Sequence, residues 1–337
     1  MAKIAVVGAT ENLGREILNF LCENDVKVSD VIALETKTPM GTQFSFGEEE
    51  DIDVLNLDDF DFSKADVALF ACGAELAKRF VPKALQKGIK IIDCSGAFAT
   101  ENDVPMIVAG LNDAALKDAK KNMVCVPSAV VTQILKPLSK VNAKYAVKRI
   151  VTSAYLSTSV RGKEAMDELF SQTRKIYMNA SLVDDEEIFK KQIAFNVLPQ
   201  VGEFIGEETD AEWRVNAEMK KVLGGNMKVH ANMAYVPAFI GAGVFVNVET
   251  VKELDLDDVR ALMEQTDGVT VFDKQLDGGY VSLNDVQGEN DIYVSRLRQD
   301  LSLENGFSFW AVADNLKADM ARHAFEVMNL MLQKQEN

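Results

Sequence analysis

The first half of the chain alternates short apolar runs with amphipathic stretches. The apolar runs have the composition expected of strands that are buried on both faces of a parallel sheet. They lie at Lys3–Gly8, Val31–Leu34, Val67–Ala71, Ile89–Asp93 and Met123–Val126. Two stretches between them, Asn12–Asn24 and Glu75–Gln86, have the period of amphipathic helices. This alternation predicts a doubly wound α/β domain of the Rossmann type.

From about Val130 onward the pattern changes to longer strands and longer helices, which is typical of an α+β domain. Two helices are expected, at Gly162–Tyr177 and Ala211–Leu223. The expected strands are Arg149–Ser157, Met227–Val236, Gly243–Val251, Ile292–Gln299 and Phe307–Val312. A last helix is expected at Asn315–Gln333, with one face formed by Leu316, Met320, His323, Ala324, Val327 and Leu330. The predicted domains are residues 1–128, completed by 315–337, and residues 129–314.

Composition narrows the possible functions. The chain has 337 residues, enough for about two domains, and its 47% hydrophobic and 26% charged residues are typical of a globular protein. Its net charge of −16 argues against partners such as nucleic acids or anionic membranes, which bind clustered Lys and Arg. No apolar run is long enough for a transmembrane helix, and the first residues enter a strand directly, which predicts no signal peptide. A cytoplasmic protein is expected.

Two further patterns favour structural interpretations. The cysteines, Cys22, Cys72, Cys94 and Cys125, lie far apart in apolar surroundings, which indicates reduced, buried thiols rather than disulfides or a metal site. The acidic stretch 48–61 carries no basic residue and is expected to form the solvated rim of a hairpin.

A glycine-containing turn follows the first predicted strand and leads into the first helix. Such a turn can hold a pyrophosphate with its backbone N–H groups and the positive end of the helix. The candidate cofactor-binding residues are Gly8, Thr10, Glu11, Asn12, Leu13 and Gly14. Glu11 occupies the middle position, where a glycine would allow the phosphate to approach, so its bulk and charge oppose binding. The alternative is a structural corner that has kept its shape without a ligand.

Several sequence blocks, spread over nearly the whole chain, form one recognisable series. They are Gly8–Glu16, Ala68–Phe70 with Gly73, Ile92–Phe98, Asp103–Pro105, Gln192–Pro199, Val246–Glu249 and Trp310–Leu316. Together they resemble bacterial aspartate-semialdehyde dehydrogenases, and within that family the chain is most similar in character to the Usg-type paralogues, which lack the active-site cysteine. The resemblance implies an NADP-binding first domain, a second domain like that of glyceraldehyde-3-phosphate dehydrogenase, and a homodimer formed through the second domain.

The residues that carry out the family's chemistry are absent at the matching positions. The nucleophilic cysteine of the N-P-N-C stretch corresponds to Ala129, the orienting glutamine to Leu156, and the catalytic histidine to Ala242. The two arginines that grip the substrate carboxylate and the phosphate correspond to Tyr235 and Ala99. Catalytic residues are therefore expected to be absent. Cys125 as a displaced nucleophile, or Ser128 with a base, would be the alternatives.

Other site positions survive only in part. Lys163, Glu212 and Arg214 remain as substrate-like contacts, and the two histidines, His230 and His323, are expected to be structural. The arginine that holds the 2′-phosphate of NADP corresponds to Thr38, with Glu35 nearby and Lys37 as the cation at hand. No cofactor is expected, unless the degenerate loop still binds NADP, and no metal is expected.

These losses favour a pseudoenzyme with a binding or scaffolding role, as a homodimer or with an unidentified protein partner. The alternatives are a nucleotide or metabolite sensor, an NADP-dependent dehydrogenase of weak activity, and an enzyme of altered chemistry. The apolar segment Gly241–Val246 is expected either to pack into the former pocket or to contact another chain. Because alanines at 129 and 242 would leave space, the favoured outcome is that Val244 and Phe245 fill the pocket.

Overall fold

The computed structural model describes residues 2–36, 39, 41–48, 50–181 and 188–333. The chain divides into two compact units. The N-terminal unit comprises Met1–Thr132 and Leu316–Asn337, and the C-terminal unit comprises Gln133–Asn315. Helix α3 (Ala129–Leu135) spans the division. No helix in the described ranges is both long and apolar enough to cross a membrane.

The N-terminal unit is built on a seven-stranded sheet in the order β3-β4-β2-β1-β5-β6-β7. All neighbouring strands are parallel except β3 and β4, which form an antiparallel hairpin at one edge. This arrangement confirms the predicted Rossmann-type domain. The strands are β1 (Ile4–Val7), β2 (Val31–Glu35), β3 (Gln43–Phe46), β4 (Glu50–Asn56), β5 (Val67–Phe70), β6 (Lys90–Asp93) and β7 (Met123–Cys125).

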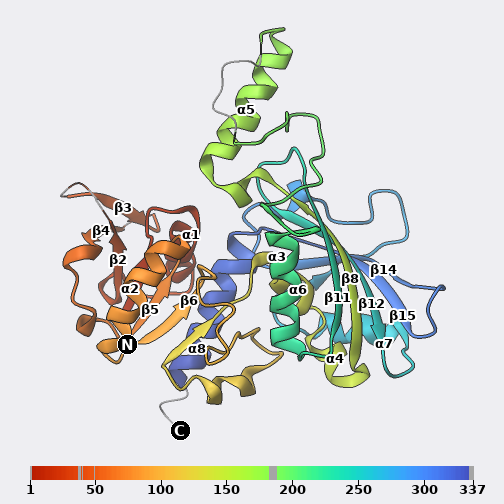
Figure 1. Ribbon diagram of the computed structural model, residues 1–337, viewed down its shortest axis with the longest axis horizontal. Coiled ribbons are helices and arrows are strands. Elements are labelled where there is room, and N and C mark those ends of the chain that lie inside the picture. Colours follow the sequence, from red (N-terminus) through yellow and green to blue (C-terminus); the bar gives the residue numbers. More distant parts are fainter. Residues whose placement is uncertain (1, 37–38, 40, 49, 182–187, 334–337) are drawn as a thin grey trace. The chain divides into compact units, whose positions relative to one another are not determined.

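Helices cover the N-terminal sheet (Figure 1), and their buried residues are mainly apolar. Helix α1 (Asn12–Glu23) and helix α8 (His323–Gln333) share one core cluster with β1, so the last helix of the chain completes this unit. Helix α2 (Ala74–Gln86) buries a separate apolar face. Short 3-10 turns lie at Val28–Asp30, Leu57–Asp59, Phe62–Lys64 and Asp113–Asp118.

Two local predictions for this unit are corrected. The predicted continuous helix Asn315–Gln333 begins later, with a π-helical turn at Lys317–Arg322 that leads into α8. The acidic stretch does more than form a solvated rim, because β4 runs through it and pairs with β2. The alternate side chains of Ile52 and Val54 are buried there, while the acidic neighbours face solvent, as the two-residue period of a strand requires.

The C-terminal unit is built on a six-stranded sheet in the order β11-β8-β12-β15-β14-β13. Its central strands β8, β12, β15 and β14 are antiparallel, and β11 and β13 add parallel edges. The unit therefore has the predicted mixed α+β character. The strands are β8 (Val147–Leu156), β11 (Lys228–Tyr235), β12 (Ala242–Thr250), β13 (Val269–Val271), β14 (Ile292–Gln299) and β15 (Gly306–Ala313).

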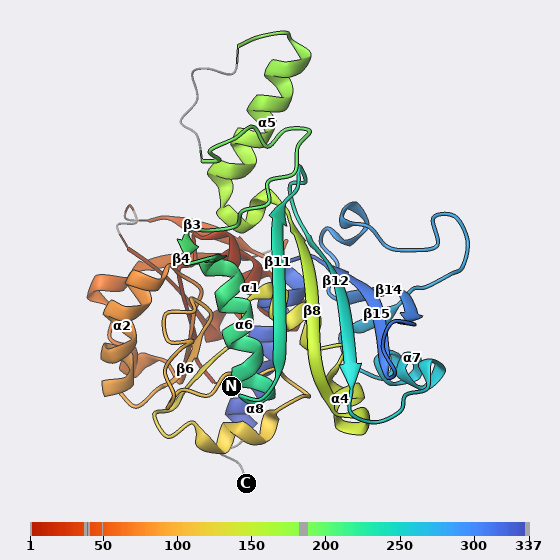
Figure 2. The same ribbon diagram turned by 45° about the vertical axis from the view of Figure 1, so that its right-hand side comes forward.

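Four helices and a small hairpin accompany this sheet (Figure 2). Helix α6 packs against β11, and α7 packs against β13 and β14, while α5 extends beyond the end of the sheet. The helices are α4 (Ser139–Tyr145), α5 (Lys163–Tyr177), α6 (Asp210–Leu223) and α7 (Leu256–Glu264), with 3-10 turns at Thr158–Arg161 and Leu283–Val286. The hairpin is formed by β9 (Phe204–Ile205) and β10 (Glu208–Thr209).

Side chains alternate between the two faces of this sheet. From residue 149 on β8 and from residue 244 on β12, the even-numbered residues are buried, whereas the odd-numbered ones are partly or largely exposed. The exposed face carries an aromatic cluster of Tyr155, Phe245 and Trp310, in which the rings of Phe245 and Trp310 lie 4.8 Å apart. The ring of Trp310 lies directly over Gly243, because a Cβ atom there would be 2.1 Å from the ring. Towards β14 and β15 this face is covered by Val281, Leu283 and Val286, and its open part is the area around Phe245, which is 41% exposed.

Candidate functional site

The glycine loop after β1 keeps the backbone geometry of a nucleotide-binding turn. Gly8 has a φ of +87°, which is strained for other residues, and its N–H donates to the carbonyl of Leu34 at the end of β2. Gly14 brings α1 against the loop so closely that a Cβ atom would lie 2.0 Å from the carbonyl oxygen of Gly8. Both glycines are therefore required by the fold of this corner, whether or not a ligand binds.

The side chains around this loop do not suit a phosphate-rich cofactor such as NADP. Glu11 is the N-cap residue of α1, is exposed, and does not cap the helix with its side chain. Glu35 lies on the other side of the loop, and its carboxylate accepts hydrogen bonds from the N–H and the hydroxyl of Thr10 at 3.3 and 2.7 Å. Two carboxylates thus adjoin the cradle in which the pyrophosphate and a 2′-phosphate would be bound. Lys37 and Thr38, predicted near the 2′-phosphate, lie outside the described residues.

Three of the four cysteines are buried in the N-terminal unit. Burial raises the pKa of Cys72 to about 12, with Asp93, Glu35 and Glu11 adding electrostatic contributions, and it raises the pKa of Cys94 well above its usual value. Cys125 is fully buried on β7, and Cys22 is half-buried. No pair forms a disulfide among the described residues, and no group there of three or more His, Cys, Asp or Glu residues could hold a metal.

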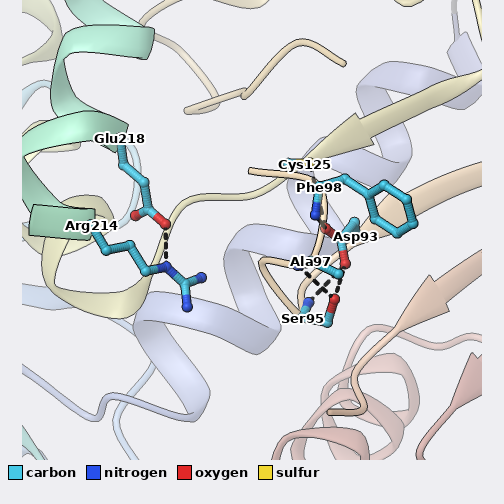
Figure 3. A network of polar contacts seen from close by, with 7 residues as sticks. All are labelled: Asp93, Ser95, Ala97, Phe98, Cys125, Arg214 and Glu218. Atoms are coloured by element: carbon cyan, nitrogen blue, oxygen red, sulfur yellow. Dashed lines mark hydrogen bonds and ion pairs between the residues drawn. The ribbon is translucent and has the colours of Figure 1, made fainter. Parts of the chain in front are cut away.

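Cys125 has a structural partner in Asp93, which organises the turn after β6 (Figure 3). The fully buried Asp93 carboxylate accepts hydrogen bonds from the N–H and hydroxyl of Ser95, from the N–H of Phe98, and from the Cys125 thiol at 3.5 Å. A thiolate at Cys125 would face a buried carboxylate, so this position opposes the charge that a nucleophile needs. The position of Cys125 in the fold therefore does not favour the alternative in which this residue acts as a displaced nucleophile.

In the C-terminal unit, two of the predicted site positions are neighbours. Leu156 ends β8 and Ala242 begins β12, and the two residues are paired directly across the antiparallel strands. Both are buried, with exposures of 2% and 0%. The carbonyl of Ala242 accepts a hydrogen bond of 2.7 Å from the buried side-chain amide of Gln133. A hydrogen bond from Gln133 therefore anchors the backbone at position 242, and apolar side chains occupy both positions.

The other predicted site positions carry no cationic side chain and no thiol. Tyr235 is buried, packs against the ring of Phe189 at 5.1 Å, and forms a backbone bridge with Leu198. In the N-terminal unit, Ala99 is 8% exposed, and Ala129 is the half-buried first residue of α3. Neither alanine can bind an anion with its side chain or transfer a proton.

The prediction that Val244 and Phe245 fill the former pocket is wrong for Phe245. Val244 is fully buried, but Phe245 is 41% exposed and belongs to the aromatic cluster on the open sheet face. The two residues are neighbours on one strand, so their side chains must point to opposite faces. The sequence marked the segment as apolar, but the strand geometry allows only one of them to be buried in the unit.

The substrate-like remnants have structural partners in the C-terminal unit. Glu212 forms a capping box with Thr209 at the start of α6, and it also accepts a hydrogen bond from the N–H of Met233. Arg214 donates to Glu218 at 2.7 Å, one turn further along the helix (Figure 3). Lys163 is exposed at the start of α5.

The two histidines lie in different units and in different environments. His323 is buried at the start of α8, where its Nε2 is 3.0 Å from the carbonyl of Ile107. His230 is exposed on β11, in the C-terminal unit. The environment of His323 is that of a structural residue, as the sequence suggested.

Three sets of contacts near the candidate site were missed from the sequence. These are the Asp93 network, the hydrogen bond between Gln133 and Ala242, and the hydrogen bonds between Glu35 and Thr10. For Glu35 a signal was available, because an acidic residue that follows the second strand of a Rossmann unit is a known ribose contact. The other two depend on long-range packing and leave no pattern in the sequence.

Comparison with known proteins identifies both parts of the chain. Residues 3–119 match the family model described as semialdehyde dehydrogenase, NAD binding domain, and residues 135–318 match semialdehyde dehydrogenase, dimerisation domain. Among curated proteins, the aspartate-semialdehyde dehydrogenases of Rickettsia bellii and Rickettsia conorii are 36% and 34% identical to it. Each alignment covers 96% of both chains.

Solved structures give the same result. Aspartate-semialdehyde dehydrogenase II from Vibrio cholerae, in complex with ASA, matches with a TM-score of 0.93 and 29% identity over 99% of this chain and 98% of that chain. A probable aspartate-semialdehyde dehydrogenase from Pseudomonas aeruginosa matches with a TM-score of 0.91 and 28% identity, covering 98% of both chains. The chain therefore belongs to the aspartate-semialdehyde dehydrogenase family.

Proposed function

We propose that this chain is a non-catalytic member of its family, with a binding or scaffolding role in place of turnover. The observation that carries the proposal is Ala129 at the position of the family's nucleophilic cysteine. An alanine cannot form the covalent acyl intermediate on which the family's reaction depends. The thiols of Cys72 and Cys94 do not offer a substitute, because burial raises their pKa values and keeps them protonated at neutral pH.

The environment of the other site positions supports the same proposal. Leu156 and Ala242 are paired and buried, so the positions of the orienting amide and the proton carrier hold side chains without polar groups. Loss of a nucleophile and its base together typically removes most of the rate enhancement of an enzyme. The loss of one group could be a variation in mechanism. The loss of both leaves no group at these positions for the nucleophilic attack or for the proton transfer.

A turnover assay tests the proposal. The purified protein is incubated with aspartate semialdehyde, phosphate and either NADP or NAD, and the reduced cofactor is measured. The Rickettsia bellii relative serves as the positive control. No turnover above background is expected. A rate within about a hundredfold of the typical enzyme value of roughly 10 per second would contradict the proposal and favour an active dehydrogenase.

We also propose that the chain forms a homodimer through the open face of the C-terminal sheet. This face carries Tyr155, Phe245 and Trp310, of which Phe245 is 41% exposed. Aromatic side chains surrounded by small polar residues are typical of the centre of an interface. The match of residues 135–318 to a dimerisation domain supports a dimer formed through this unit.

Sedimentation of the wild-type protein and two variants tests the dimer. The wild-type protein is expected at twice its chain mass of 37.1 kDa. Phe245→Arg places a charge in the aromatic cluster and is expected to give monomers at micromolar concentration. Leu55→Arg is the matched control, because Leu55 is 45% exposed on the N-terminal sheet, and it should remain dimeric. A monomeric wild-type protein, or a dimeric Phe245→Arg variant, would contradict the proposed interface.

A further inference from the structure

Glu35 is positioned at the edge of the nucleotide loop by the strand that precedes it. The carbonyl of Leu34, the residue before it, accepts hydrogen bonds from the N–H groups of Gly8 and Ala9 at 3.0 and 3.1 Å. The end of β2 and the loop are thus joined through the backbone. Glu35 therefore cannot move away from the loop without breaking contacts that hold the loop itself.

Both carboxylate oxygens of Glu35 are fixed. One oxygen accepts from the N–H and hydroxyl of Thr10 in the loop, and the other accepts from the N–H of Thr36 at 2.7 Å. The residue is only 8% exposed. A carboxylate that is held in this way cannot turn outward to avoid an approaching anion, in contrast to the exposed Glu11.

The place of Glu35 in the fold has a known meaning in dinucleotide-binding domains. An acidic residue after the second strand, about 20 residues beyond the glycine loop, accepts a hydrogen bond from the 2′-hydroxyl of the adenine ribose. A 2′-phosphate at the same place would bring a dianion against the carboxylate, and at such a short distance repulsion between like charges is strong. Proteins that accept the 2′-phosphate instead offer an arginine.

We infer that Glu35 sets the cofactor selectivity of this loop, favouring a dinucleotide with a free 2′-hydroxyl, of the NAD type, over one with a 2′-phosphate, of the NADP type. The inference depends on the chain having an NAD-binding domain, which its family match supports, and not on the proposed lack of catalysis. It would hold equally for an active enzyme.

The electrostatics of this corner agree with the inference. Besides burial, the charges of Asp93, Glu35 and Glu11 all raise the pKa of the neighbouring Cys72 thiol, so the corner concentrates negative charge. Glu11 adjoins the position of the pyrophosphate, which NAD and NADP share. It is therefore expected to weaken the binding of both cofactors to a similar degree. Glu35 adjoins the position of the 2′-phosphate, in which the two cofactors differ, so removing Glu11 should expose the selectivity.

Titration of three proteins with NAD and NADP tests the inference by calorimetry. The Glu11→Gly variant is expected to bind NAD at least about tenfold more tightly than NADP, which is a difference of about 1.4 kcal/mol. Glu11→Gly combined with Glu35→Gln, which keeps the size of the side chain but removes its charge, should lose this ratio through a gain in NADP affinity. Glu11→Gly combined with Asp118→Asn removes an exposed carboxylate in the same unit and should keep the ratio.

Three results would overturn the inference. The Glu11→Gly variant could bind NADP as tightly as NAD, or the Glu35→Gln change could leave the ratio unchanged. The third is that a Glu11→Gly protein, with a wild-type melting transition, binds neither dinucleotide at millimolar concentration. Turnover plays no part in these readouts, so failure here is distinct from failure of the proposed function.

Discussion

The nucleotide loop of the N-terminal unit and the strand ends of the C-terminal unit both have regular backbone geometry, but their side chains differ in kind. At the loop, Gly8 and Gly14 form the turn, and the side chains beside it include the carboxylates of Glu11 and Glu35. At the strand ends, Leu156 and Ala242 are paired, and both side chains are apolar and buried.

This difference has a physical consequence. A charge at an exposed position such as Glu11 can be removed by one substitution with little effect on packing. A buried apolar position cannot regain a polar group without the cost of burying it. The loop is therefore expected to recover binding by single changes, whereas the strand ends are expected to resist recovery of their chemistry.

The largest effect is expected when a polar group is returned to the strand ends. Leu156→Gln replaces a side chain that is 2% exposed and should lower the free energy of unfolding by about 4 kcal/mol, since apolar burial is lost and an amide is buried. Urea denaturation measures the change. Leu156→Met conserves volume and should cost no more than about 1.5 kcal/mol. If the glutamine variant were as stable as the methionine variant, the strand ends would be polar and solvated, and the comparison would fail.

A somewhat smaller effect is expected at the loop backbone. Gly14→Ala forces a Cβ atom against the carbonyl of Gly8 and should destabilise the protein by roughly 3 kcal/mol, as overpacking typically does. Thermal denaturation is the measurement. Gly73→Ala is the control, because a Cβ atom there meets nothing within 4 Å, and its cost should stay within about 1 kcal/mol. Equal stability of the two variants would show that position 14 is not packed tightly against the carbonyl of Gly8.

The smallest effects are expected from surface carboxylates, which should behave alike in the two units. Hydrogen bonds from Ser63, with Lys87 adding to them, lower the pKa of Asp61 to about 2, and a hydrogen bond from Lys144 lowers the pKa of Asp258. A lowered pKa in the folded state stabilises the protein above the ordinary pKa near 4, and this contribution is lost as the pH falls through the folded value.

Stability measured against pH checks this expectation. Asp61→Asn and Asp258→Asn should each lower the melting temperature slightly at pH 6, and the difference from wild type should shrink as the pH falls toward 2. A penalty that stays constant down to pH 2 would mean that the charge of these groups is not the source of the stabilisation.

The sequence predicted the framework far better than the contacts within it. Apolar runs such as Lys3–Gly8 identified the strands, because burial on both faces or on one face leaves a direct pattern of residue types. The end of the chain was less well predicted, since nothing in its apolar spacing distinguishes the π-helical turn Lys317–Arg322 from an α-helix. Phe245 was predicted to be buried because the segment is apolar, and only the strand pairing shows which face it occupies.

In the candidate site, too, some features could be predicted from the sequence and others could not. Ala129, Leu156 and Ala242 were assigned to site positions from the short stretches of sequence around them, such as the N-P-N-C-like stretch at Ala129. The hydrogen-bond partners of the polar groups cannot be read from the sequence, because contacts such as that between Asp93 and Cys125 join residues far apart in the chain. Sequence patterns report burial and local structure, but hydrogen bonds over such separations depend on the folded chain.

The most direct test of the central claim is intact-protein mass spectrometry after incubation with aspartate semialdehyde and either NADP or NAD, without phosphate. In a catalytic relative, a cysteine thiol adds to the aldehyde and forms a thiohemiacetal. The carbon of this adduct then transfers hydride to the oxidised cofactor, which leaves an acyl thioester on the protein. The Rickettsia bellii relative is the positive control. For this chain we expect an unchanged mass, because Ala129 has no thiol and Cys125 is buried against Asp93. A stoichiometric adduct that hydroxylamine removes, and that maps to Cys125 or another cysteine, would contradict the account.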